Sequence, residues 1–273
     1  MIQIIYENHR YTHSIHGFYD SVSALKKGVQ KPFDSKYWSE YKALERLLPD
    51  FKILKGKKPA PDLAKLRSYV HPDELQRTIQ DILVQWSAEA TVGKSRGTSY
   101  HDMKEQRDKR EGHAVCHMDR QKYPIRDPHE LTFEYKRSLL TSLKDVERSV
   151  CYPELMIWSD KYKYAGTIDN LFVLKDGRLY FWDYKTDKRF RTENRWSKLL
   201  APISHLDDCE LNVYALQLSL YALPFVDLGF EIAELEIMHN HFGLETVYTL
   251  PILIEEARAV AKANYFSKHN TFI

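Results

Sequence analysis

Two apolar segments separated by a tight turn constrain the fold of this chain more than any other feature. They run from residue 165 to 174 and from 178 to 186, and both are rich in β-branched and aromatic side chains. Lys175, Asp176 and Gly177 lie between them, where a three-residue hairpin loop favours a glycine in the left-handed conformation. The sequence therefore predicts an antiparallel β-hairpin here.

The register of this hairpin brings two acidic residues together. With Leu174 opposite Arg178, Asp169 lies directly opposite Asp183, and cross-strand partners have Cβ atoms only about 4.5–5.5 Å apart. Lys185 projects from the same face as Asp183, because side chains alternate along a strand. Carboxylates this close repel each other unless a cation neutralises them, and hard cations such as Mg²⁺ prefer carboxylate oxygens. We therefore expect a divalent cation here; a solvated strand face is the alternative.

The remaining chain reads as helices followed by strands, then a helix, strands and a closing helix. We expect a hairpin over 2–13, helices over 21–30, 34–48, 71–90, 96–110, 131–148, 210–223 and 252–270, and strands within 150–186, 233–239 and 245–250. Basic loops are expected over 50–70 and 187–207, and irregular chain over 111–127. The order indicates an α/β (or α+β) fold, with an N-terminal hairpin and helical region, 1–92, packed on a core, 93–273.

Composition limits the function classes without selecting one. The 273 residues carry a formal charge of only +2, so a nucleic-acid-binding role would depend on local basic segments. The three cysteines, Cys116, Cys151 and Cys209, are far apart and odd in number, which favours free thiols in a reducing cytoplasm. We expect no signal peptide and no membrane span, since neither a basic leader nor a long apolar run occurs.

Polar residues on two predicted helices extend the acidic site. His101 lies near the start of the 96–110 helix, and a neutral imidazole is a ligand for divalent ions; a core or surface histidine is the alternative. Gln217 and Tyr221 are four residues apart, so they share a helix face. The Gln217 amide either faces a phosphate or Lys185, or is a satisfied polar group between helix and sheet.

Four short motifs occur in a fixed order along residues 95–240. They are Gly97 to His101, Gly166 to Asp169, Asp183-Tyr184-Lys185, and Gln217 to Tyr221. In this order they resemble the RecB-like branch of the PD-(D/E)XK nucleases, whose pattern is G-x-x-x-H, G-x-x-D, D/E-x-K and Q-x-x-x-Y. The N-terminal part is similar to phage-type exonucleases of this branch.

The resemblance implies a restriction-endonuclease-like core, a central mixed sheet flanked by helices, and a set of site residues. Mg²⁺ or Mn²⁺ would be held by His101, Asp169, Asp183 and the Tyr184 carbonyl, with Glu154 as a ligand for a second metal or else a surface carboxylate. Lys185, Gln217 and Tyr221 would complete the catalytic set, with Lys185 acting on the attacking water. No iron–sulfur cluster is expected, since members that carry one need four cysteines and none follows Cys209.

Basic and aromatic residues beside this site are expected to contact DNA, as linear duplex or single-stranded ends. Phosphate contacts are expected from Lys and Arg, and base stacking from aromatic rings. The expected set is Arg96, Lys188, Arg189, Phe190, Arg191, Arg195, Trp196 and Lys198.

The sequence and the resemblance together favour a metal-dependent DNA exonuclease. Its expected setting is phage or cellular DNA recombination, repair or replication in the cytoplasm (the host cytoplasm for a phage protein), with a recombination protein as a candidate partner. Two alternatives stay open: a catalytically inactive DNA-binding protein on the same fold, and a structure-specific endonuclease or resolvase.

Overall fold

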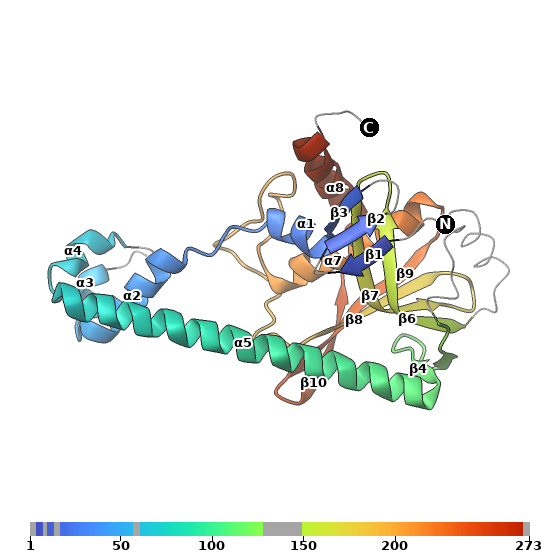
Figure 1. The fold of residues 1–273 in the computed structure, drawn as a ribbon, viewed down its shortest axis with the longest axis horizontal. Helices are drawn as coiled ribbons and strands as arrows, with labels where there is room; N and C mark the ends of the chain where they lie inside the picture. The colour runs from blue at the N-terminus through green and yellow to red at the C-terminus, as the bar shows by residue number, and fades with distance from the viewer. Residues whose placement is uncertain (1–3, 8–9, 14–16, 57–60, 128–148, 270–273) are drawn as a thin grey trace. The chain divides into compact units, whose positions relative to one another are not determined.

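The computed structural model describes residues 4–7, 10–13, 17–56, 61–127 and 149–269. They divide into two compact units. The sheet unit comprises Met1–Lys31 and Ser99–Ile273, and the helical unit comprises Pro32–Thr98. The longest helix, α5 (Pro72–Glu111), begins in the helical unit and ends in the sheet unit (Figure 1).

The sheet unit is built on one eight-stranded mixed sheet and a separate two-stranded one. The large sheet contains β1 (Ile4–Glu7), β2 (Arg10–His13), β3 (Gly17–Ser21), β6 (Val150–Ser159), β7 (Tyr164–Val173), β8 (Leu179–Lys185), β9 (Ile232–His241) and β10 (Leu244–Leu250). The small sheet pairs β4 (His113–Val115) with β5 (Lys122–Pro124). The fold is therefore α/β with a mixed central sheet.

Strand β7 is the hub of the large sheet. The strand order is β1-β2-β3-β7-β8-β9-β10, and β6 pairs with β7 outside this path. The β3–β7 and β8–β9 pairs are parallel, and the remaining pairs are antiparallel. Because β6 follows β7 along its whole length, β3 and β8 share the opposite edge of β7.

Side chains alternate between two cores, one on each face of the sheet. Leu171, Val173 and Phe181 belong to the core that also contains residues of α1 (Val22–Gly28), α7 (Glu210–Asp227) and α8 (Ile254–His269). Phe172 and Tyr180 belong to the second core, which includes Tyr100 of α5 and residues of β4 and β5. Among the described residues, no helix is long and apolar enough to cross a membrane.

Helix α1 begins where the sequence predicts. The Ser21 hydroxyl accepts a hydrogen bond from the Ala24 N–H at 3.0 Å, which caps the helix. Val22 and Leu25, three residues apart, are 1% and 2% exposed and anchor α1 to the first core. Lys26 follows Leu25 directly, and its backbone position is therefore fixed by this packing.

The helical unit has its own core, formed by α2 (Ser35–Leu47), α3 (Phe51–Lys55), α4 (Leu63–Arg67) and the beginning of α5. Asp34 caps α2 as predicted, accepting from the Tyr37 N–H at 2.9 Å. The basic loop predicted over 50–70 was wrong in part, because Phe51, Leu63 and Leu66 are buried and draw this segment into two short helices.

Three further predictions need correction. The helices expected over 71–90 and 96–110 are one continuous helix, α5, which contains Gly93 and Gly97. A glycine inside a helix costs only about 1 kcal/mol relative to alanine, so it weakens such a helix without ending it. The irregular chain expected over 111–127 contains β4 and β5, held by the buried Ala114 and Tyr123. The helix expected over 131–148 lies outside the described residues.

The domain boundary also differs from the expected division at residue 92. The N-terminal hairpin continues into β3, which pairs with Tyr164 and Ala165 of β7 and so extends the central sheet. Residues 1–31 therefore belong to the same compact unit as the core, and only 32–98 form a separate unit.

Candidate active site

The site lies where the ladder along β7 is interrupted. On one edge of β7, β8 pairs only with Asn170–Val173 and β3 only with Tyr164 and Ala165. Within the described chain, residues 166–169 therefore have no strand partner on this edge. We call residues 166–169 the open segment and residues 170–173 the closed segment. On this edge, the described structure therefore leaves the backbone of the open segment outside the strand ladder, although residues 166–168 still pair with β6 on the other edge.

The predicted hairpin register is confirmed. Leu174 N–H donates to the Arg178 carbonyl at 2.9 Å, Gly177 has a φ of 89°, and the pairs run from Val173↔Leu179 to Asn170↔Trp182. The next position in this register places Asp169 opposite Asp183. The ladder stops there, and the Asp169 carboxylate instead accepts a hydrogen bond from the Tyr184 N–H at 2.7 Å.

Asp183 and Lys185 form a buried ion pair. The Asp183 side chain is 3% exposed and that of Lys185 is 14% exposed, and the Lys185 ammonium contacts the Asp183 carboxylate. Lys185 Nζ also donates to the Tyr184 carbonyl at 3.2 Å. Burial lowers the pKa of Lys185, while the negative charges of Asp169 and Asp187 oppose that shift. Lys185 thus supplies the positive charge that neutralises one of the two aspartates.

Asp169 is neutralised from another element. His101 Nδ1, on α5, lies 3.2 Å from Asp169 Oδ2, and the His101 ring meets the Tyr184 ring edge-on. Burial alone lowers the pKa of His101, but the hydrogen bond to Asp169 and its charge outweigh burial, so the pKa lies above its usual value. A metal ion would compete with this proton, because an imidazole ligand must be neutral.

Glu154 adds a third carboxylate beside Asp169. It lies between the pairs Pro153↔Asn170 and Leu155↔Ile168, at the position opposite Asp169, and its φ of 50° interrupts the ladder. Such a left-handed conformation costs a non-glycine residue roughly 1–2 kcal/mol. Although Glu154 is an exposed residue of β6, partial desolvation, followed by the charges of Asp169 and Glu105, raises its pKa to about 7. Glu154 is thus a third carboxyl group at the open segment, beside the two aspartates that His101 and Lys185 contact.

Gln217 and Tyr221 lie on α7, and the Tyr221 ring packs against Gly166 of the open segment. Gln217 Nε2 donates to the Tyr221 hydroxyl at 3.1 Å, and both side chains are almost fully buried. A Cβ atom on Gly166 would lie 2.5 Å from Tyr221 Cε1 and 3.0 Å from Val22 Cγ2, so only glycine fits here. Gly166, the first residue of one motif, thus packs against Tyr221, the last residue of another.

The Gln217 amide oxygen faces neither Lys185 nor open solvent. It accepts a hydrogen bond at 2.7 Å from Lys26 Nζ of α1, which is 191 positions earlier in the chain. Lys26 carries no motif and was missed in the sequence. Its local signal is its place directly after Leu25, one of the two buried residues of α1.

The donor set suits a hard or borderline divalent cation by its chemistry, since it offers carboxylates, one imidazole and one carbonyl. Among the described residues, however, no group of three or more His, Cys, Asp or Glu side chains gathers closely enough to hold a metal ion. In the arrangement described, Asp183 is engaged by Lys185 and Asp169 by His101 and the Tyr184 N–H.

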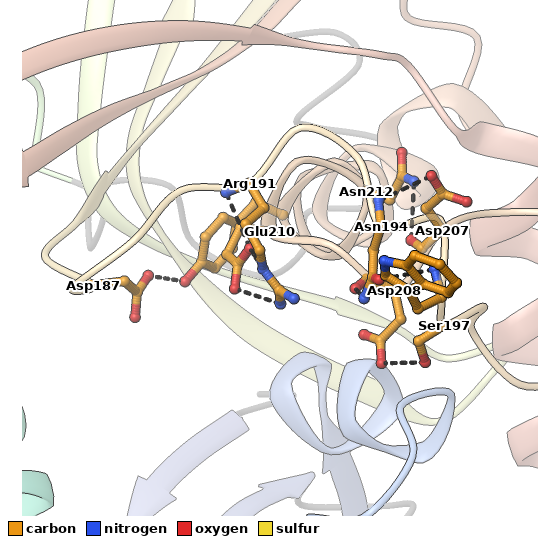
Figure 2. Close-up of polar contacts among 10 residues, drawn as sticks. Asp187, Arg191, Asn194, Ser197, Asp207, Asp208, Glu210 and Asn212 are labelled. Carbon is orange, nitrogen blue, oxygen red and sulfur yellow. Dashed lines mark hydrogen bonds and ion pairs between the residues drawn. The ribbon is translucent and has the colours of Figure 1, made fainter. Parts of the chain in front are cut away.

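Hydrogen bonds and ion pairs hold the segment between β8 and α7, residues 186–209 (Figure 2). Arg191 forms a two-point contact with Glu210 at 2.7 and 2.9 Å, and Lys198 Nζ lies 2.5 Å from Asp207 Oδ1. Asn194 donates to the Asp208 carbonyl at 2.7 Å, and Arg195 lies 3.4 Å from Glu193. Arg191, Arg195 and Lys198 are therefore ion-paired. Pairs this exposed contribute little to stability, so phosphate could replace the carboxylates.

The other predicted nucleic-acid contacts differ in their surroundings. Arg189 is exposed and has no ion-pair partner among the described residues, and Lys188 is exposed beside it. Trp196 is 92% exposed, whereas Phe190 packs against the first core and stacks on Tyr248 with ring centroids 3.9 Å apart. Stacking on bases is thus open to Trp196, while Phe190 already has an aromatic partner. Arg96 belongs to the helical unit.

Comparisons with known proteins provide little beyond the geometry. No family model matches the chain, and no curated protein matches it. A solved structure titled "Crystal structure of SSO0001" is similar at 16% identity and a TM-score of 0.25, covering 49% of this chain and 58% of that chain. At that TM-score the likeness supports no argument about fold or function.

Proposed function

We propose that this protein is a metal-dependent deoxyribonuclease that hydrolyses phosphodiester bonds, acting as an exonuclease. The observation that carries the proposal is the convergence of Asp169, Asp183, Lys185 and His101 at the interrupted edge of β7. Four residues of these types have little structural reason to share one place, since a sheet position of this kind is normally filled by apolar side chains.

Each residue has a chemical task under this proposal. His101, Asp169, Asp183 and the Tyr184 carbonyl would hold Mg²⁺ or Mn²⁺, with Glu154 beside them. When bound, such an ion polarises the phosphoryl oxygen and lowers the pKa of a water molecule. Lys185 orients the attacking water and offsets the negative charge that develops on the phosphate.

The arrangement of Lys185 suits this role. Its ammonium lies against Asp183 and the Tyr184 carbonyl, the two groups nearest to it in the chain. Burial favours the neutral amine, so a proton held there is given up more readily than from an exposed lysine. The Lys185 side chain is thereby ready both to hold and to release a proton at the site.

A cleavage assay tests the proposal. End-labelled linear DNA and closed circular DNA are incubated with Mg²⁺, Mn²⁺ or EDTA, using the parent and the Asp183→Asn variant. We expect the parent to degrade linear DNA only with metal, and the variant to lose activity at least 100-fold, as is typical when charge stabilisation at the reacting centre is removed. Lys175→Met, at the far hairpin turn, is the matched control.

The other outcomes distinguish the alternatives. Rapid cutting of closed circles would favour a structure-specific endonuclease. Metal-independent DNA binding without any cleavage would favour an inactive DNA-binding protein. Normal cleavage by Asp183→Asn, with the protein folded, would remove this site from the reaction altogether.

A further inference from the structure

Lys26 shares an aromatic ring with the predicted catalytic lysine. Lys26 Nζ lies 5.1 Å from the centroid of the Tyr214 ring, and Lys185 Nζ lies 5.1 Å from the same centroid. Lys26 also donates to Gln217, whose amide in turn donates to Tyr221. Helix α1 therefore delivers a second ammonium group to the border of the site.

The hydrogen-bond partner of this second ammonium is a neutral amide, that of Gln217, and not a carboxylate. Asp183 is engaged by Lys185, and the Asp187 carboxylate accepts a hydrogen bond from the Tyr214 hydroxyl while its charge raises the pKa of Lys26. Burial and the charge of Lys185 lower the pKa of Lys26 to about 7. Two partly buried ammonium groups held near one ring repel each other, and an anion bound between them would relieve that repulsion.

A groove leads away from Lys26. It has a volume of about 580 Å³, and its basic lining residues are Lys26, Lys27, Lys188, Arg189 and Arg191, with Tyr214 in its wall. Asp187, Asp208 and Glu210 line it as well, of which Glu210 is paired with Arg191 and Asp187 with Tyr214. The volume is that of a small-ligand pocket, roughly 300–1,000 Å³, which suits a short stretch of single strand better than a duplex.

We infer that Lys26 is a phosphate-binding residue and that this groove takes the backbone of a single nucleic-acid strand beside the bond that is cut. The inference rests on the proposed function for the identity of the ligand. Phosphate groups of a strand are bound by basic side chains without base-specific contacts, and five basic side chains line the groove, of which Arg191 is already paired with Glu210. Gln217 then acts as a positioning residue that holds the Lys26 ammonium toward the groove.

Salt-dependent binding tests this inference without requiring cleavage. A fluorescent single-stranded oligonucleotide is titrated in EDTA at several salt concentrations against the parent, Lys26→Met, Lys26→Arg and Lys175→Met. Each phosphate contact to a single strand contributes about 0.7 to the slope of log K against log salt. We expect Lys26→Met to flatten the slope by about that amount and to weaken binding roughly tenfold, the effect of one charge-assisted hydrogen bond.

Lys26→Arg should keep the parental slope, because it keeps the charge, and Lys175→Met should match the parent. A parental slope in folded Lys26→Met overturns the inference. If Lys26→Met does not fold, Lys26→Gln is measured in its place, judged by the same slope. Unlabelled duplex that competes as well as single strand overturns the choice of ligand. A parent that never cleaves with Mg²⁺ or Mn²⁺ overturns the proposed function alone, since the slopes are measured without metal.

Discussion

The two segments of β7 are neighbours in one strand and differ in their strand pairing. The closed segment, residues 170–173, is paired on both edges, and Leu171, Phe172 and Val173 are at most 2% exposed. Among the residues that the structure describes, the open segment, residues 166–169, pairs with β6 alone, and that pairing is interrupted at Glu154. Its end carries Asp169, whose partners are a helix side chain and a backbone N–H.

Because of this difference, the closed segment mainly stabilises the fold, while the open segment carries residues of the candidate site. Each buried apolar side chain of the closed segment, Leu171, Phe172 and Val173, contributes about 1.5–3 kcal/mol through burial. The open segment contains a glycine where a side chain would clash and a charged residue where a core residue would stabilise. The closed segment therefore serves as the rigid base from which the open segment presents its polar groups, and substitutions in the two should have different effects.

The largest effect on stability is expected in the closed segment. Phe172→Ala removes a ring that packs on Tyr123 and Tyr180 in the second core, and should cost about 3–5 kcal/mol of unfolding free energy. Urea unfolding followed by tryptophan fluorescence measures this. Leu244→Ala, at a position 69% exposed, is the control and should change stability by less than about 0.5 kcal/mol. Equal effects from the two would contradict the assignment of the closed segment as the base.

A smaller loss is expected at the start of the open segment. Gly166→Ala forces the Tyr221 ring to move, because the new Cβ would lie 2.5 Å from Cε1, and overpacking of this kind typically costs about 1–3 kcal/mol. Thermal unfolding and the cleavage assay should both report a loss. The control is Gly93→Ala, where nothing lies within 4 Å and alanine should stabilise the helix by up to about 1 kcal/mol.

A double variant sharpens this prediction. If the Tyr221 ring is the obstacle, Tyr221→Leu should make the further change Gly166→Ala much less costly than it is in the parent. Additive losses would mean that Gly166 is required for another reason, such as its contact with Val22.

The smallest effect is a pH dependence at Glu154. Its pKa in the folded protein is about 7, against an ordinary value of 4.5, so the folded state binds this proton more tightly than the unfolded state. The resulting stability is complete below about pH 4.5 and is lost as pH rises to about 7. In a chelating buffer, Glu154→Gln should lose less stability than the parent over this range, as measured by thermal unfolding.

Asp169→Asn provides the matched comparison for Glu154. The Asp169 charge contributes to the raised pKa of Glu154, so its removal should shift the loss of stability to lower pH without abolishing it. If the parent and Glu154→Gln gave parallel stability curves, the negative charge around the open segment would not be the cause of any pH dependence there.

Much of the fold could be predicted from interactions between residues that are close in the sequence. Gly177 in the left-handed conformation and the alternation of apolar side chains were enough to predict the hairpin and its register, and Ser21 and Asp34 were enough to predict where two helices begin. These signals act over a few residues, where backbone conformation and capping decide the outcome. The position of Asp169 opposite Asp183 follows from that register.

Predictions that needed the energy of distant contacts were less accurate. The segment 50–70 has many lysines and prolines, and its two short helices depend on burial of Phe51 and Leu66 in the helical unit. Phe190 occurs within a run of cations, yet its ring packs on Tyr248, which is far along the chain. The composition of a segment indicates how polar it is, but it does not show which of its side chains pack against apolar residues elsewhere in the chain.

The sequence by itself determined the hairpin, the shared face of Gln217 and Tyr221, and the order of the acidic and basic groups, because these depend on neighbours in the chain. Only the tertiary structure decided that α1 lies against α7, so that Lys26 reaches Gln217, and that β3 and β8 leave the open segment between them. The reason is physical: such contacts arise when separate elements bury their apolar faces together, and no periodicity within either element specifies its partner.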